Sequence, residues 1–350
     1  DATLVFAGLT ITRQVLFTGA VIGLTYGILA VGLVLIYRST RVVNFAQGQM
    51  GALAGSILAY LVIQENWHYF VALPLAIAVG GVIGATVELT VVRRLFSAPR
   101  VILFVATLGV AQVLFLLELL LPDQKTFARF PTAFERTFHL AGITFGSEHV
   151  TVLALVPLLT AALTWFLGRT HTGMTVRAAA DNAEAARLAA VNPKQLSTVV
   201  WTLAGVLAAL TAVLVLPLRN VDPSAALALG PGLLLRALAA AVVGRMTSMP
   251  VAMAAGVGIG VLETVLVTSF LDQPGLTDMI LFVIVLGAVL IQSLRGTAGE
   301  DEEGTSWSFA PRVQPIPEAL RRIRWVRRLP LITGGLGLLL AVVLPFVVTE

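Results

Sequence analysis

Long runs of apolar residues, separated by short polar segments, follow one another along the whole chain. Several runs reach the roughly 20 residues with which an α-helix crosses the hydrocarbon core of a bilayer. Helices are favoured there because each helix satisfies its backbone hydrogen bonds within itself. We predict an all-α, polytopic helical membrane protein with about nine transmembrane helices and one extra C-terminal helix. The predicted spans are 14–37, 49–63, 70–92, 101–121, 150–168, 198–217, 231–244, 251–270, 278–294 and 330–348.

The polar segments divide the chain into three predicted parts. Residues 1–294 hold nine spans and form one transmembrane domain, and residues 330–350 form an additional transmembrane helix. Residues 295–329 form a cytoplasmic linker that is first acidic and proline-rich, then basic and amphipathic. Two interpretations fit the basic stretch: a helix lying on the anionic inner leaflet, or the usual positive flank of the next span.

The distribution of Lys and Arg predicts the orientation, because loops rich in these residues stay in the cytoplasm. With the N-terminus outside, 17 of the 23 basic residues lie inside, five lie outside, and Arg236 falls within a span. The span 231–244 is short, so both a full crossing and a broken or re-entrant helix fit it. The charge of Arg245 favours the crossing.

Composition narrows the function further. Apolar residues make up 57% of the chain and charged residues 12%, which leaves no soluble domain of normal size. Cysteine is absent, which excludes disulfides, thiolate metal sites and cysteine nucleophiles. The histidines fall in loops or at interfaces without metal-ligand spacing: His68, His139, His149 and His171. We therefore expect no catalytic residue, no metal, no cofactor and no nucleic-acid partner.

One polar segment, residues 169–197, carries charges of both signs at helical spacing. Arg177 and Asp181 are four residues apart, and Glu184 and Arg187 are three apart, so each pair can meet on a helix. We expect this helix to touch a soluble partner, although a solvated connector also fits. The opposite face carries small residues that a partner could approach closely: Ala179, Ala183, Ala186 and Ala190.

The segment Asn44 to Gln49, between the first two predicted spans, combines polar amides with a glycine. Such a sequence at membrane depth is tolerated where it packs in protein or lines a wet cavity. It therefore fits a translocation pathway. A simple cytoplasmic turn capped by Asn44 fits equally well.

Ionisable residues within spans are candidates for function because lipid disfavours their charge. Glu88, Arg236 and Glu263 qualify, whereas we expect Glu118 to lie near the outer surface. Glu88 is placed to neutralise the nearby Arg93. Glu263 is expected to make a polar contact between helices, beside a small-residue packing pair formed by Gly256 and Gly260.

Four motifs in order resemble the permease subunits of ATP-binding-cassette importers for branched-chain amino acids, over roughly residues 14 to 294. The first runs from Gly23-Leu24-Thr25-Tyr26 into Asn44-Phe45-Ala46-Gln47-Gly48, and the second from Glu88 through Arg93-Arg94-Leu95 to Thr107-Leu108-Gly109. The third joins Arg177-Ala178 and Asp181 to Glu184-Ala185-Ala186 and Val191-Asn192, and the fourth joins Val243-Gly244 and Ser248-Met249-Pro250 to Gly256, Gly260 and Glu263.

This resemblance implies a transport subunit rather than an enzyme, in the plasma (inner) membrane of a bacterium. It implies ABC ATPase subunits, a second permease or fused half, an extracytoplasmic substrate-binding protein and lipid as partners. The cytoplasmic helix at 175–192 would contact the ATPase, through Arg177, Asp181, Glu184, Arg187, Val191 and Asn192. The translocation pathway would include Asn44, Gln47, Gly48, Gln49 and Glu263. The last predicted helix resembles the start of a second permease half.

Departures from the family pattern concern the substrate more than the fold. Gln49 stands where glutamate is usual, and Arg245, Thr247 and Val251 stand where glycines are common. The chain has no phosphate-binding loop of the form GxxxxGK[ST], so ATP hydrolysis is expected on a partner subunit or distal domain. The rival hypothesis is an ion-coupled secondary transporter or channel. It predicts midplane carboxylates and internal repeats, and the sequence offers few of the former and no clear repeat.

Overall fold

The computed structural model describes residues 4–6, 9–96, 98–121, 130–134, 136–140, 142–181, 193–219, 229–270 and 274–296. The chain divides into two compact units, Asp1–Gly304 and Thr305–Glu350, and every described residue belongs to the first. The predicted linker beyond Gly296 and the predicted C-terminal helix therefore lie outside the described residues.

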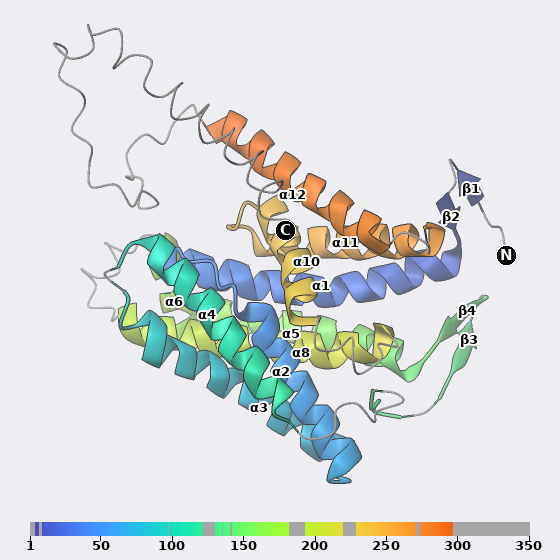
Figure 1. The fold of residues 1–350 in the computed structure, drawn as a ribbon, viewed down its shortest axis with the longest axis horizontal. Coiled ribbons are helices and arrows are strands. Elements are labelled where there is room, and N and C mark those ends of the chain that lie inside the picture. The colour runs from blue at the N-terminus through green and yellow to red at the C-terminus, as the bar shows by residue number, and fades with distance from the viewer. Residues whose placement is uncertain are drawn as a thin grey trace, which may run out of the picture. The chain divides into compact units, whose positions relative to one another are not determined.

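Helices make up nearly all of the described structure (Figure 1). They are α1 (Arg13–Thr40), α2 (Gln47–Ala59), α3 (Tyr69–Val87), α4 (Arg100–Leu119), α5 (Ser147–Arg169), α6 (His171–Asp181), α8 (Pro193–Arg219), α10 (Leu229–Val243), α11 (Met249–Ser269) and α12 (Pro274–Gly296). Single π-helical turns extend α2 over Tyr60–Gln64 and α3 over Glu88–Val92. Two short antiparallel hairpins complete the elements: β1 (Leu4–Phe6) with β2 (Leu9–Ile11), and β3 (Phe138–Leu140) with β4 (Ile143–Phe145).

Each of the first nine predicted spans coincides with a described helix, with boundaries that differ by at most five residues, so the helical class is confirmed. Among the described residues, six helical segments are long and apolar enough to cross a membrane: Arg13–Thr40, Tyr69–Val92, Arg100–Leu119, Ser147–Arg169, Lys194–Leu218 and Met249–Ser269. Leu229–Val243 and Gly275–Ile284 are shorter apolar helices.

The central helices of the described unit are α1 and α8. Both are apolar on all sides, and most of their residues are buried by other helices. The outer helices α4 and α5 instead leave large apolar side chains exposed, among them Val105, Leu116 and Leu158. An apolar outer surface around an apolar centre fits a lipid environment, where exposure of such side chains has no cost.

Glycines bring the backbones of α1 and α11 into contact. A Cβ atom on Gly23 would lie 2.5 Å from the Cα atom of Val257, and one on Gly256 would lie 2.5 Å from the backbone nitrogen of Gly27. Small residues four apart allow this approach, and close packing replaces the hydrophobic drive that lipid does not supply. The predicted packing role of Gly256 and Gly260 is confirmed, since both face glycines of α1.

The start of α2 lies inside the helix bundle rather than at its edge. After α1 ends, the chain turns back at Arg41, whose φ is 55°, and Asn44, Gln47 and Gln49 are all buried. Gly48 packs directly against the carbonyl of Gly230 at the start of α10. Figure 1 shows α10 at a steep angle to α1 and α11. Its 15 residues extend about 22 Å, which is less than the roughly 30 Å hydrocarbon core.

Candidate functional site

The two amides of the Asn44–Gln49 segment that face the bundle are fully used by the protein itself. The side-chain oxygen of Asn44 accepts from the backbone N–H of Ala46 at 3.0 Å, and its amide donates to Gln47 Oε1 at 3.0 Å. Gln47 Nε2 donates to the carbonyl of Ala204 on α8 at 2.8 Å. Both side chains are completely buried. The Asn44 contacts close the turn before α2, whose N-cap residue Ala46 makes no side-chain cap hydrogen bond, and the Gln47 contact fastens the start of α2 to α8.

A second buried group joins α2 to α4. Gln49 Nε2 donates to one carboxylate oxygen of Glu118, and Ser56 Oγ donates to the other at 2.6 Å. Glu118 lies one residue before the end of α4, and α2 covers it so that it is only 1% exposed. The carboxylate projects from α4 toward α2, where polar side chains replace water around it.

A third polar group joins three late helices around Arg236. The guanidinium of this α10 residue donates to Glu263 Oε1 on α11 at 2.8 Å and to Asp278 Oδ1 on α12 at 3.1 Å. It also donates to the carbonyl of Gly232 at 2.9 Å. The expected inter-helix contact of Glu263 is therefore present. Asp278, whose side chain is 59% exposed, was not foreseen, because it is the first residue of its predicted span and was not counted as an ionisable group within the membrane.

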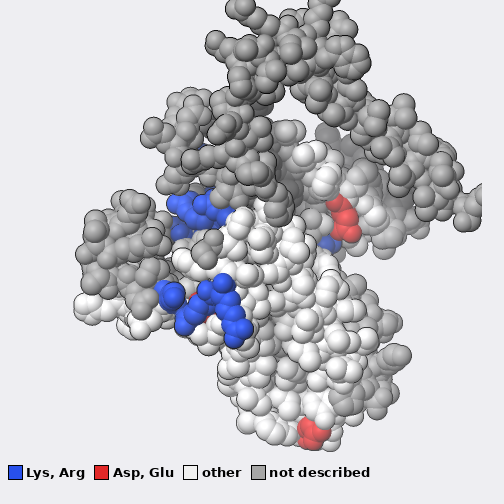
Figure 2. Space-filling view, turned by 60° about the vertical axis from the view of Figure 1, so that its left-hand side comes forward, with Lys and Arg blue, Asp and Glu red and all other residues white. Residues whose placement is uncertain are grey.

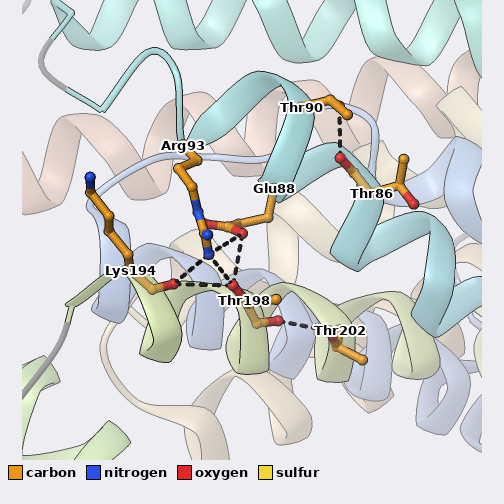
Figure 3. A network of polar contacts seen from close by, with 7 residues as sticks. All are labelled: Thr86, Glu88, Thr90, Arg93, Lys194, Thr198 and Thr202. Atoms are coloured by element: carbon orange, nitrogen blue, oxygen red, sulfur yellow. Dashed lines mark hydrogen bonds and ion pairs between the residues drawn. The ribbon is translucent and has the colours of Figure 1, made fainter.

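A fourth network ties the end of α3 to the start of α8 (Figure 3). Arg93 donates to both oxygens of Glu88, at 3.3 and 3.1 Å, and to the hydroxyl of Thr198 at 2.6 Å. Thr198 Oγ1 lies 2.8 Å from Glu88 Oε2. Arg93 also donates to the carbonyl of Lys194, one residue after the start of α8. Glu88 thus neutralises Arg93, as its spacing suggested, and the pair anchors the chain just after residues 182–192.

The described part of the predicted cytoplasmic helix is α6. Val176 is buried, Gly173 packs against the Phe166 carbonyl, and Arg177 is exposed. Ala179 is half-buried and packs against a cluster of buried residues that includes Leu167, Val176 and Val200. The remaining predicted coupling residues, Glu184, Arg187, Val191 and Asn192, lie outside the described residues, as do Ala183, Ala186, Ala190 and the side chain of Asp181.

Basic side chains gather at the end of the bundle that carries α6. Figure 2 shows Lys and Arg together on this face, whereas Asp and Glu appear at separate places. Six basic residues near the ends of helices or on α6 are exposed: Arg41, Arg94, Arg169, Arg177, Lys194 and Arg245.

A partly enclosed cavity of about 380 Å³ lies between α1, α5, α8 and α11. An open depression of about 820 Å³ shares Thr160, Thr164 and Met253 with it and extends along α5 to Arg169. On α5 the lining of the open depression includes Pro157, Thr160, Thr164 and Gly168. Small or weakly polar residues therefore recur there every three or four positions. We drew no candidate residue from this helix, although that spacing was visible in the sequence.

Comparison with known proteins identifies the protein family. Residues 15–293 match the family described as the branched-chain amino acid transport system / permease component. The chain belongs to this family. The prediction of a membrane permease, as opposed to an ATPase or another enzyme, is thereby confirmed.

Individual relatives are similar over most of their length. The permease protein BraD of a high-affinity branched-chain amino acid transport system in Pseudomonas aeruginosa is 26% identical, over 83% of this chain and 96% of BraD. The probable branched-chain amino acid permease LivH of Methanocaldococcus jannaschii is 27% identical, over 82% of this chain and 90% of LivH. The ribose import permease RbsC of Escherichia coli K12 is 28% identical, over 70% of this chain and 73% of RbsC. No solved structure matches the chain.

Proposed function

We propose that this permease forms part of the translocation route of an ABC importer for branched-chain amino acids, in the inner membrane of a bacterium. The family match over residues 15–293 carries the proposal, and the high-affinity branched-chain relatives support the substrate class. ATP hydrolysis then occurs on ATPase subunits, an extracytoplasmic binding protein delivers the solute, and a second permease half completes the route.

The proposed orientation has the N-terminus outside and nine helices within the membrane, with α10 as a short one. The gathered basic residues at the α6 end support it. Because the chain has no cysteine, single cysteines report accessibility without background. A cysteine at Ala133 should react with a membrane-impermeant maleimide in intact cells, and one at Ala178 should react only after permeabilisation. The reverse pattern would refute the orientation.

Coupling to the ATPase is assigned to α6 and the segment that follows it. The exposed Arg177 and the polar network that holds Arg93 to the start of α8 support this assignment, since both flank residues 182–192. A helix docked on α5 by Val176 and Gly173 would transmit a displacement as a rigid body.

Charge reversal tests the coupling role. The double variant Asp181→Lys and Glu184→Lys should insert normally but hydrolyse ATP without uptake, because it repels a partner surface and leaves the core unchanged. Glu65→Lys, an exposed charge reversal outside α6, is the matched control and should keep coupling. Coupled uptake in the double variant would favour the solvated connector.

We propose that the segment Asn44–Gln49 shapes the translocation route. Gly48 allows α2 to pack against α10, and Glu263 helps to hold α10 in place through its ion pair with Arg236. Full use of Asn44 and Gln47 by protein partners supports this shaping role. Gln47→Leu removes a donor to the Ala204 carbonyl and the acceptor of the buried Asn44 amide, so stability should fall by about 1–3 kcal/mol. Uptake per folded molecule distinguishes a role in the translocation route from a purely structural role. An unchanged value would limit Gln47 to holding the fold.

A further inference from the structure

The cavity between α1, α5, α8 and α11 holds no side-chain charge among the described residues that line it. Its walls are leucine, isoleucine, valine, methionine, proline and alanine side chains together with two threonines. Its volume of about 380 Å³ lies within the range of small-molecule sites. The space therefore suits an apolar group of a small solute.

The two threonines do not change this chemistry, because their hydroxyl protons are already used. Thr160 donates to the carbonyl of Val156 at 2.8 Å, and Thr164 donates to the carbonyl of Thr160 at 2.7 Å. A sugar entering the cavity would leave its hydroxyl oxygens without donors, and burying unpaired polar groups is unfavourable. An isobutyl or isopropyl group needs no donor and gains from leaving water.

Continuity with a longer space distinguishes the cavity from a packing defect. The open depression that shares Thr160, Thr164 and Met253 extends along the same face of α5 and reaches Arg169. Arg169 is the last residue of α5, and α6 begins at His171. The wall of the cavity is thus continuous with the helix that precedes the coupling segment.

The walls can also adapt to branched side chains of different shape. Met249 and Met253 line the α11 side, and methionine is unbranched and flexible. The α1 side is different, because Ile28 and Val31 are buried members of the packed core. One fixed wall and one adaptable wall would accept leucine, isoleucine and valine alike.

We propose that this cavity is the subsite that receives the apolar side chain of the transported amino acid and that it makes the permease selective against sugars. The inference rests on the proposed function for its substrate class. It assigns specificity to Thr160, Thr164, Met253 and Ala254, none of which belongs to the Asn44–Gln49 segment.

Cysteine protection tests this subsite in membrane vesicles that carry the full chain with its ATPase. Single cysteines replace Thr164 and Ala254, which line the cavity, and Gly258, which lies one turn beyond Ala254 on the same exposed face of α11. The probe is a small, positively charged methanethiosulfonate, and the solutes are L-leucine and D-ribose. At leucine ten times its dissociation constant, labelling at Thr164 and Ala254 should slow about tenfold. Ribose should have no effect, and Gly258 should show no leucine dependence.

Each other outcome overturns the subsite. Unreactive cysteines at Thr164 and Ala254 would mean that lipid fills the cavity. Equal protection by ribose, or no protection by leucine, would remove the proposed selectivity. A second pair of variants does not depend on labelling: Ala254→Phe should lower leucine uptake about tenfold and Gly258→Phe should leave it unchanged. Leucine uptake by the unaltered protein decides the proposed function separately, because its absence would refute that function whatever the cysteines show.

Discussion

Replacing Arg93 by Met tests whether the network between α3 and α8 stabilises the bundle. Glu88 is 1% exposed, and Arg93 supplies two of its hydrogen bonds. Removing one partner of a fully buried ion pair costs about 3–5 kcal/mol, because the other charge stays buried without its partner. Since the Arg93 side chain is 33% exposed, water screens part of this interaction. The expected loss is therefore near the lower limit, about 3 kcal/mol.

The assay is reversible unfolding in mixed detergent micelles, with Arg94→Met as the matched control. Arg94 is the next residue and is exposed, so the same loss of charge should change the free energy of unfolding by less than about 0.5 kcal/mol. Adding Glu88→Gln to Arg93→Met should recover about 2 kcal/mol, since glutamine keeps an acceptor for Thr198 without a charge. The reasoning fails if Arg93→Met costs no more than Arg94→Met, or if Glu88→Gln deepens the loss.

Three further substitutions give separate outcomes. Arg245→Gly should raise the melting temperature or leave it unchanged. Arg245 has a φ of 55°, a conformation that costs other residues roughly 1 kcal/mol but that glycine adopts freely. A clear decrease in melting temperature would contradict this. Gly23→Leu should abolish the monodisperse peak in size-exclusion chromatography, since its side chain would overlap Val257, while Gly258→Leu should preserve it because Gly258 has open space around it. Gln49→Leu should lower the free energy of unfolding by about 1–3 kcal/mol, as Glu118 loses a buried donor, and a neutral result would mean that another group replaces it.

The helices were predictable because crossing a bilayer requires a long apolar run, and this signal needs no tertiary information. The connections between the helices were harder to predict from the sequence. Arg41, Arg245 and Met246 have positive φ although none of them is a glycine, so these positions carry no sequence marker of that conformation.

Burial by neighbouring helices was the second limit. Glu118 was expected near the outer end of its span, but its contacts with Gln49 and Ser56 on α2 were not foreseen. Partners from helices far apart in the chain decide burial, and a single sequence does not show them. The pairing of Glu88 with Arg93 was predictable for the opposite reason, since five residues separate them along the same helical segment.

The contact between α1 and α11 also has a consequence for how the protein is made. Gly23 enters the membrane early in synthesis, but its partner Gly256 emerges roughly 230 residues later, a delay on the order of 10–50 s at usual rates of translation. Throughout this interval the glycine face of the first helix lacks its final neighbour and must be occupied by lipid, by the insertion machinery or by another nascent helix. Biogenesis of this permease is therefore expected to be most vulnerable to quality-control proteases before α11 has been inserted.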